Sequence, residues 1–85
     1  MIKLIKSYGE FKIKQGEYII IEAAKDRVWN IRAAAAKYIE KIDENEKLFM
    51  KLLSDENWWV RNNTAENLIS KGEKGENILI NALNL

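Results

Sequence analysis

The sequence predicts an all-α protein built from stacked helical hairpins, and three observations support this prediction. Six positions recur at an offset of 29 residues: Asp26, Trp29, Ile31, Arg32, Ala36 and Ile39 are followed by Asp55, Trp58, Val60, Arg61, Ala65 and Leu68. The chain contains no proline, which suits helices throughout. Its four glycines lie outside residues 17–71, so the turns in that stretch must be made by other residues. A repeat of this length with apolar stripes is typical of hairpins that bury their apolar faces against each other.

The hydrophobic spacing then predicts each helix in order. Asp26 and Asp55 each precede a stretch with the apolar spacing of one helical face, and a carboxylate at a helix start can accept free backbone N–H groups. Polar breaks follow at residues 43–45 and 70–72, with Gly72 expected at the C′ position of its helix. Residues 71–76 are expected to form a flexible turn. The predicted helices cover residues 2–8, 15–25, 28–41, 45–54, 57–70 and 74–84.

Residues 10–22 allow two interpretations. Their alternating residues, followed by a β-branched run at 18–21, would also suit a β-hairpin. The repeat favours a helix, because the apolar positions before Asp26 recur before Asp55 and again, one residue late, near the C-terminus. These three sets are Ile20, Ile21, Ala23 and Ala24; Phe49, Met50, Leu52 and Leu53; and Leu79, Ile80, Ala82 and Leu83.

Composition limits the possible functions. The 85 residues are expected to form one domain, and 47% hydrophobic with 32% charged residues is typical of a globular protein. The net charge is +1 and no basic stripe is present, which disfavours nucleic acid or an anionic membrane as the main partner. The chain has no cysteine and no histidine, so disulfides, thiolate chemistry and the commonest general base are absent. We therefore expect no enzyme activity, no metal, no cofactor and no membrane segment, in a cytoplasmic setting.

The repeated strings resemble the HEAT repeat, in its short form of about 30 residues. The strings that carry the resemblance are Ala-Ala-Lys-Asp-Arg-Val-Trp-Asn-Ile-Arg at 23–32 and Leu-Leu-Ser-Asp-Glu-Asn-Trp-Trp-Val-Arg at 52–61. The second unit departs from the family pattern, with Thr64-Ala65 where an alanine pair is usual. The resemblance implies a right-handed α-α superhelix within a single domain, residues 1–85. Its repeat units would be 17–43 and 46–72, with a half-repeat at 74–85. This arrangement resembles a piece cut from a longer array, and self-association through exposed end repeats is expected.

The resemblance also implies roles for charged residues. In the family, an aspartate of one repeat and an arginine of the next form a structural ladder, which here would comprise Asp26, Arg32, Asp55 and Arg61. The pair that this order implies is Asp26 with Arg61. A guanidinium that is partly buried against a carboxylate would fix the stacking register.

The tryptophans are expected to divide into core and surface. Trp29 and Trp58 recur at the same repeat position, so we expect both to be buried and truncation of Trp58 to unfold the domain. Trp59 corresponds to Asn30, a polar residue, and is expected to be exposed as a recognition residue.

The resemblance places the second helix of each hairpin on a concave side where partners bind. The partner-binding residues expected there are Asn30, Lys37, Trp59, Asn62, Asn63 and Glu66. Ala33 and Ala34 would allow close approach. The favoured function is a protein-interaction or scaffold module for a protein or peptide. The alternative is a nucleic-acid-binding domain related to HEAT-like proteins that recognise alkylated DNA.

Overall fold

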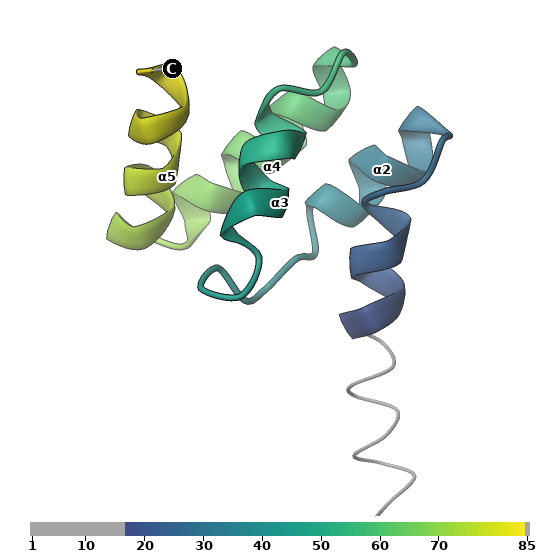
Figure 1. Cartoon of the computed structure of the whole chain (residues 1–85), viewed down its shortest axis with the longest axis horizontal. Helices are drawn as coiled ribbons and strands as arrows, with labels where there is room; N and C mark the ends of the chain where they lie inside the picture. Colours follow the sequence, from purple (N-terminus) through teal and green to yellow (C-terminus); the bar gives the residue numbers. More distant parts are fainter. Residues whose placement is uncertain (1–16, 85) are drawn as a thin grey trace, which may run out of the picture.

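The computed structural model describes residues 17–84, and all the regular secondary structure in this range is helical. Residues 17–23 are helical, and four further helices follow in a row (Figure 1). These are α2 (Trp29–Ala36), α3 (Glu46–Leu53), α4 (Trp58–Ser70) and α5 (Glu73–Leu83). The all-helical prediction is confirmed for these residues. Within 17–22 the chain is helical rather than part of a hairpin, whereas the helix expected at 2–8 lies outside the described residues.

Helix α2 is much shorter than expected, since it ends at Ala36 rather than near residue 41. The backbone N–H groups of Lys37 and Tyr38 bond the carbonyls three residues earlier, at 3.2 and 2.9 Å, which tightens the last turn. The Asn67 side chain donates to the Ala36 and Ile39 carbonyls at 2.7 and 3.0 Å. Because a side chain from α4 satisfies these carbonyls, the helix can end there without leaving them unpaired.

The two aspartate turns form as predicted, although the aspartates are not the helix caps. The Asp26 carboxylate accepts the Val28 N–H, and the Asp55 carboxylate accepts the Asn57 N–H, each at 2.9 Å. Before α4 the cap is Asn57, whose side-chain oxygen accepts N–H bonds from Trp59 and Val60. The aspartates therefore shape the turns, and an asparagine satisfies the free N–H groups of α4.

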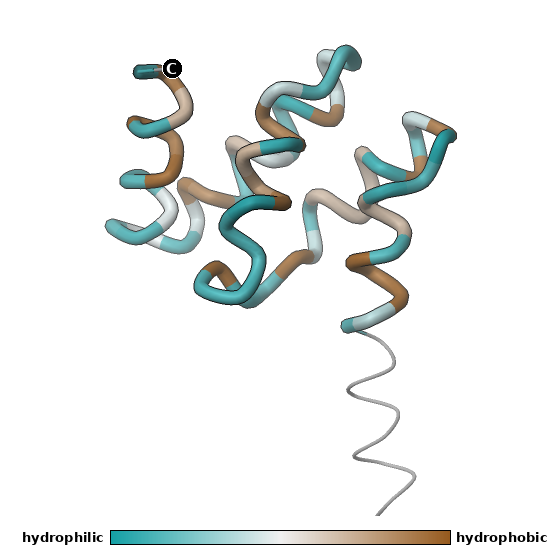
Figure 2. Tube along the Cα trace, in the orientation of Figure 1, coloured by the Kyte–Doolittle hydropathy of each residue, from teal (hydrophilic) through white to brown (hydrophobic). Residues whose placement is uncertain are grey.

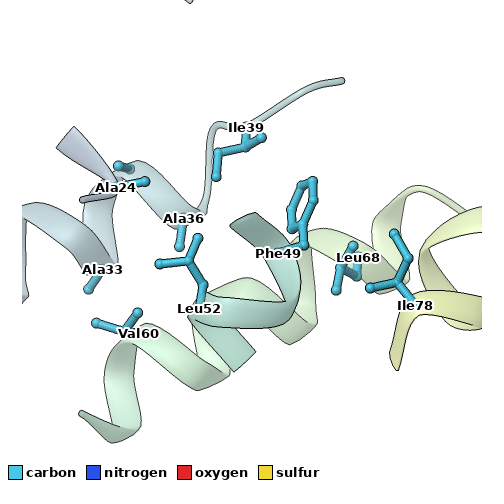
Figure 3. Packing of buried hydrophobic residues seen from close by; sticks show 10 residues of the cluster. Ala24, Ala33, Ala36, Ile39, Phe49, Leu52, Val60, Leu68 and Ile78 are labelled. Atoms are coloured by element: carbon cyan, nitrogen blue, oxygen red, sulfur yellow. The ribbon is translucent and has the colours of Figure 1, made fainter. Parts of the chain in front are cut away.

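Helix α4 is the centre of the packing, because it contacts α2, α3 and α5. Its residues Val60, Thr64 and Leu68 are fully buried, as their helical spacing predicts. From α3, Phe49 and Leu52 project into the same cluster, with Leu52 among small residues of α2 and Phe49 near Leu68 (Figure 3). Apolar segments accordingly alternate with polar ones along the helices (Figure 2).

The apolar face predicted after Asp26, which would comprise Val28, Ile31, Ala35, Ile39 and Ile42, is only partly correct. Val28 and Ile31 are exposed, whereas the alanines Ala33, Ala35 and Ala36 are buried. An alanine surface lets two helices approach closely, since little side chain separates their backbones. The alanine run therefore faces the core, and the larger residues at the start of α2 face solvent.

The two glycines around residue 73 have different roles. Gly72 directly follows the C-cap Lys71 with a φ of +77°, so the C′ prediction is confirmed. Gly75 was expected in a flexible turn, but it is buried in the first turn of α5. A Cβ atom at Gly75 would lie 1.8 Å from the Leu68 carbonyl oxygen. The absence of a side chain at this position therefore allows α5 to lie against the backbone of α4.

We predict that Gly75→Ala destabilises the domain by about 1–3 kcal/mol, because the clash with a backbone carbonyl outweighs the better helix propensity of alanine. Urea unfolding followed by circular dichroism measures the change. The matched control is Asn77→Ala, at an exposed position of the same helix, which should be neutral or slightly stabilising. Equal stability of Gly75→Ala and the wild type would show that α5 can shift without cost.

Candidate interaction groove between α2 and α4

A bidentate ion pair joins Arg32 of α2 to Asp55 in the turn before α4. The guanidinium of Arg32 donates to both oxygens of Asp55, with Nε–Oδ2 at 2.8 Å and Nη2–Oδ1 at 3.1 Å. Its Nη1 also donates to the Asp26 and Arg27 carbonyls at 2.8 Å. Both side chains of the pair are mostly buried, with 13% and 12% exposed. One guanidinium thus holds two turns that are 29 residues apart in the repeat.

The expected pairing of Asp26 with Arg61 is therefore wrong. The arginine of the earlier unit reaches the aspartate of the later one, which reverses the order that the resemblance implied. The Asp26 carboxylate instead accepts the Val28 N–H. Arg61 turns back to its own unit and donates to the Asp55 carbonyl at 2.7 Å. Both arginines bind the carbonyl of the aspartate six residues before them, and Arg32 alone of the two continues to the next unit.

The environment of Asp55 favours its ionised form. Burial by itself would raise its pKa, but the hydrogen bonds from Arg32 and from the Asn57 N–H, with the charges of Arg32 and Arg61, outweigh this effect. The pKa of Asp55 is consequently below its ordinary value of 3.8. A carboxylate that folding makes more acidic stabilises the folded state at neutral pH.

Two asparagines of α4 bind the backbone of α2. Asn63 donates from Nδ2 to the Ala33 carbonyl at 2.8 Å, and Asn67 donates to the carbonyls of Ala36 and Ile39. Both asparagines are buried. Their spacing of four residues places them on one face of α4, one turn apart. Sequence reasoning missed Asn67, although its spacing from Asn63 and the alanine run of α2 were the signals that could have identified it.

Beside these bonds the structure contains a shallow groove of about 260 Å³. Its lining comes from α2, the residues just after α2, and the first half of α4. The lining residues are Trp29, Asn30, Ala33, Ala34, Lys37, Tyr38, Trp59 and Asn63. Trp29, Tyr38 and Trp59 are exposed, whereas Ala33 and Asn63 are buried. The groove is thus lined by three exposed aromatic side chains, together with a buried alanine and a buried, hydrogen-bonded asparagine.

The structure brings four of the six expected binding residues into this groove: Asn30, Lys37, Trp59 and Asn63. Asn62 and Glu66 do not line it and instead bond each other, with Asn62 Nδ2 donating to Glu66 at 3.3 Å. Asn63 differs from the expectation, because its amide N–H already serves the Ala33 carbonyl. Tyr38 was not expected in the groove. It lies beyond the early end of α2, which the apolar spacing did not predict.

The expected division of the tryptophans is correct for Trp59 and wrong for the other two. Trp59 is 52% exposed, but Trp29 and Trp58 are also exposed, at 43% and 56%. Trp58 and Trp59 form an edge-to-face pair with ring centroids 4.7 Å apart. The recurrence of tryptophan at one repeat position therefore marks a surface position here. The core is formed by smaller side chains, which allow α2 and α4 to pack closely.

No group of three or more metal-ligating side chains occurs within residues 17–84. None of the helices in the same range is long and apolar enough to cross a membrane.

We predict that Asp55→Asn destabilises the domain by about 1.5–3 kcal/mol at neutral pH, because it removes charge-assisted hydrogen bonds from a mostly buried guanidinium. Folding lowers the pKa of Asp55, so the ionised carboxylate stabilises the folded state fully above pH 3.8. This stabilisation is lost as the pH falls through the lower pKa that Asp55 has in the folded state. The difference between wild type and variant should therefore shrink in acid. Urea unfolding at several pH values measures it. Asp26→Asn is the matched control and should show a smaller difference at neutral pH.

We predict that Asn67→Ala costs about 1–3 kcal/mol, because it leaves the carbonyls of Ala36 and Ile39 without their donor. Thermal unfolding by circular dichroism measures the loss. Asn62→Ala removes an asparagine that bonds only Glu66 at the surface, so it should change stability little. If the two substitutions had equal effects, the bonds of Asn67 to α2 would contribute nothing.

The comparisons with known proteins agree with the helical hairpin. Residues 47–70 match the family model for the HEAT repeat, and this range covers nearly all of α3 and α4. Searches of curated proteins and of solved structures found no match. HEAT repeats generally mediate protein interactions or scaffolding, and the family is generally non-catalytic. The likeness to the HEAT repeat thus rests on residues 47–70, which form the hairpin of α3 and α4.

Proposed function

We propose that the groove between α2 and α4 binds a segment of a protein partner, so that the domain acts as a non-catalytic interaction or scaffold module. The observation that carries this proposal is the set of exposed aromatic side chains, Trp29, Tyr38 and Trp59, around one groove. Tryptophan and tyrosine are enriched among the residues that contribute most binding energy at protein interfaces.

The floor of the groove supports a preformed site. Asn63 fixes the first half of α4 to the Ala33 carbonyl, and the Arg32–Asp55 pair fixes the turns that precede both helices. Trp29 and Trp59 therefore project from two helices that these bonds hold against each other. A preformed surface loses less conformational freedom on binding than a flexible one, which favours affinity.

The groove suits an extended or helical peptide better than a compact ligand. It is shallow, and Ala34 presents little side chain, so a backbone can approach it closely. Asn30 and Lys37 supply polar contacts at the groove. Polar residues beside aromatic ones are the usual composition of a peptide-binding surface, because the aromatic residues supply buried area and the polar residues supply orientation.

Nucleic acid is the weaker alternative. Lys37 is the only basic residue among those lining the groove, and the whole chain has a net charge of +1. Binding to duplex DNA depends on neutralising several phosphates, and one lysine provides little of this.

We predict that Trp59→Ala lowers peptide binding by about thirtyfold or more while leaving helicity unchanged, because an exposed interface tryptophan contributes about 2 kcal/mol or more to binding. Peptides selected from a random displayed library against the wild-type chain serve as the probe, and fluorescence titration gives the affinity. Trp58→Phe is the control, because Trp58 does not line the groove and phenylalanine keeps an aromatic edge beside Trp59.

A second arm of this experiment separates the two functions. The wild-type chain is titrated with duplex DNA at low salt, where phosphate contacts are strongest. Selected peptides that bind Trp59→Ala as tightly as wild type would contradict the proposed groove. Salt-dependent DNA binding without peptide binding would support the nucleic-acid alternative instead.

A further inference from the structure

The polar groups that line the groove between α2 and α4 define which kind of segment fits it, given that the groove binds a protein segment as proposed. Trp29, Trp59 and Lys37 each carry N–H groups that donate hydrogen bonds and no nitrogen or oxygen that accepts one. Asn30 and Tyr38 can do both. No carboxylate occurs among the described residues of the lining. The groove therefore offers a bound segment more hydrogen-bond donors than acceptors.

The regular conformations of a peptide differ in the backbone groups that they present to such a surface. A helical segment uses its interior carbonyls in its own hydrogen bonds. A β-strand brings one N–H for every carbonyl, so it needs acceptors as well as donors. A polyproline II segment makes no internal hydrogen bonds, and each proline in it removes one N–H while keeping the carbonyl. A proline-rich segment in this conformation is therefore the best match for a lining that is rich in donors.

The spacing of the two helices also fits this conformation. Helices α2 and α4 run in the same direction, because Asn63 bonds Ala33 and Asn67, one turn later, bonds Ala36. Packed helices lie about 8–10 Å apart. A polyproline II segment has three residues per turn and rises about 3.1 Å per residue, so residues three apart lie on one face at about 9 Å. Two prolines at positions i and i+3 can therefore reach the two groove tryptophans, one on each helix.

The charge in the groove distinguishes acidic from basic segments. Lys37 is exposed and is the one charged residue among the described residues of the lining. The faces of the tryptophans by themselves would also attract a cation, but the ammonium group of Lys37 repels it. A carboxylate on the segment would instead pair with Lys37. Such an exposed pair adds little affinity, so its main effect is on the choice of partner.

We propose that the partner of this groove is a proline-rich segment in the polyproline II conformation, with prolines at positions i and i+3 and a carboxylate beside them. One proline ring packs on Trp29 and the other on Trp59, and the carboxylate pairs with Lys37. The indole N–H groups and the Tyr38 hydroxyl are the donors for the carbonyls of the segment. Because this conformation is already populated before binding, the segment loses little conformational freedom when it binds.

Three synthetic peptides of equal length test the proposal in fluorescence titrations of the whole 85-residue chain. The first has proline at every third position, alanine between the prolines, and one glutamate after the last proline. The second has alanine in place of each proline, and the third has lysine in place of the glutamate. The first peptide should bind about tenfold or more tighter than the second, because the second has no proline rings for the tryptophans. It should bind about threefold tighter than the third, since an exposed charge pair is weak.

Variants of the chain assign each contact. Trp29→Ala and Trp59→Ala should each weaken binding of the first peptide by about tenfold or more, whereas Trp58→Phe should leave it unchanged, because Trp58 does not line the groove. Lys37→Glu should reverse the preference between the glutamate and lysine peptides. The matched control is Lys47→Glu, which makes the same charge change at an exposed position of α3 away from the groove and should keep the preference. Circular dichroism should show equal helicity for all variants.

The outcomes separate this proposal from the peptide-binding function itself. Peptides selected from a random library that depend on Trp59 but contain no repeated proline would overturn the proline-rich partner and leave the groove as a peptide site. A library that yields no peptide dependent on Trp59 would overturn both. A first peptide that binds no tighter than the alanine peptide overturns the proposal, and equal binding of the glutamate and lysine peptides overturns the role of Lys37.

Discussion

The position of α2 on α4 depends on hydrogen bonds from two buried asparagines. Asn63 and Asn67 donate to backbone carbonyls near the end of α2, and this replaces the bonds that a longer helix would have made itself. A buried carbonyl without a hydrogen-bond donor destabilises the fold. The early end of α2 therefore depends on Asn67, whose side chain supplies the missing donor. The same arrangement places Tyr38 beside the groove rather than on a continuing helix.

The ion pair of Arg32 and Asp55 supplies the second link between the units. It joins the turns at the N-terminal ends of α2 and α4, whereas Asn67 acts at the C-terminal end of α2. A pair of helices held at both ends has a fixed separation and angle. This explains how a small domain can present aromatic side chains on a rigid surface, with alanines rather than large side chains filling the contact between the two helices.

Three exposed aromatic side chains, Trp29, Tyr38 and Trp59, line one groove. Trp29 and Trp59 lie at the starts of α2 and α4 and line the groove, which is the basis for the proposed partner-binding function.

The sequence by itself determined the helical class, the HEAT resemblance, the aspartate turns, Gly72 at its C′ position and the exposure of Trp59, since these depend on spacing and local backbone chemistry. The tertiary structure alone decided the early end of α2, the exposure of Trp29 and Trp58, and the pairing of Arg32 with Asp55. It also gave Gly75 its role beside Leu68. Each of these depends on how closely and at what angle two helices pack, which a repeat offset does not specify.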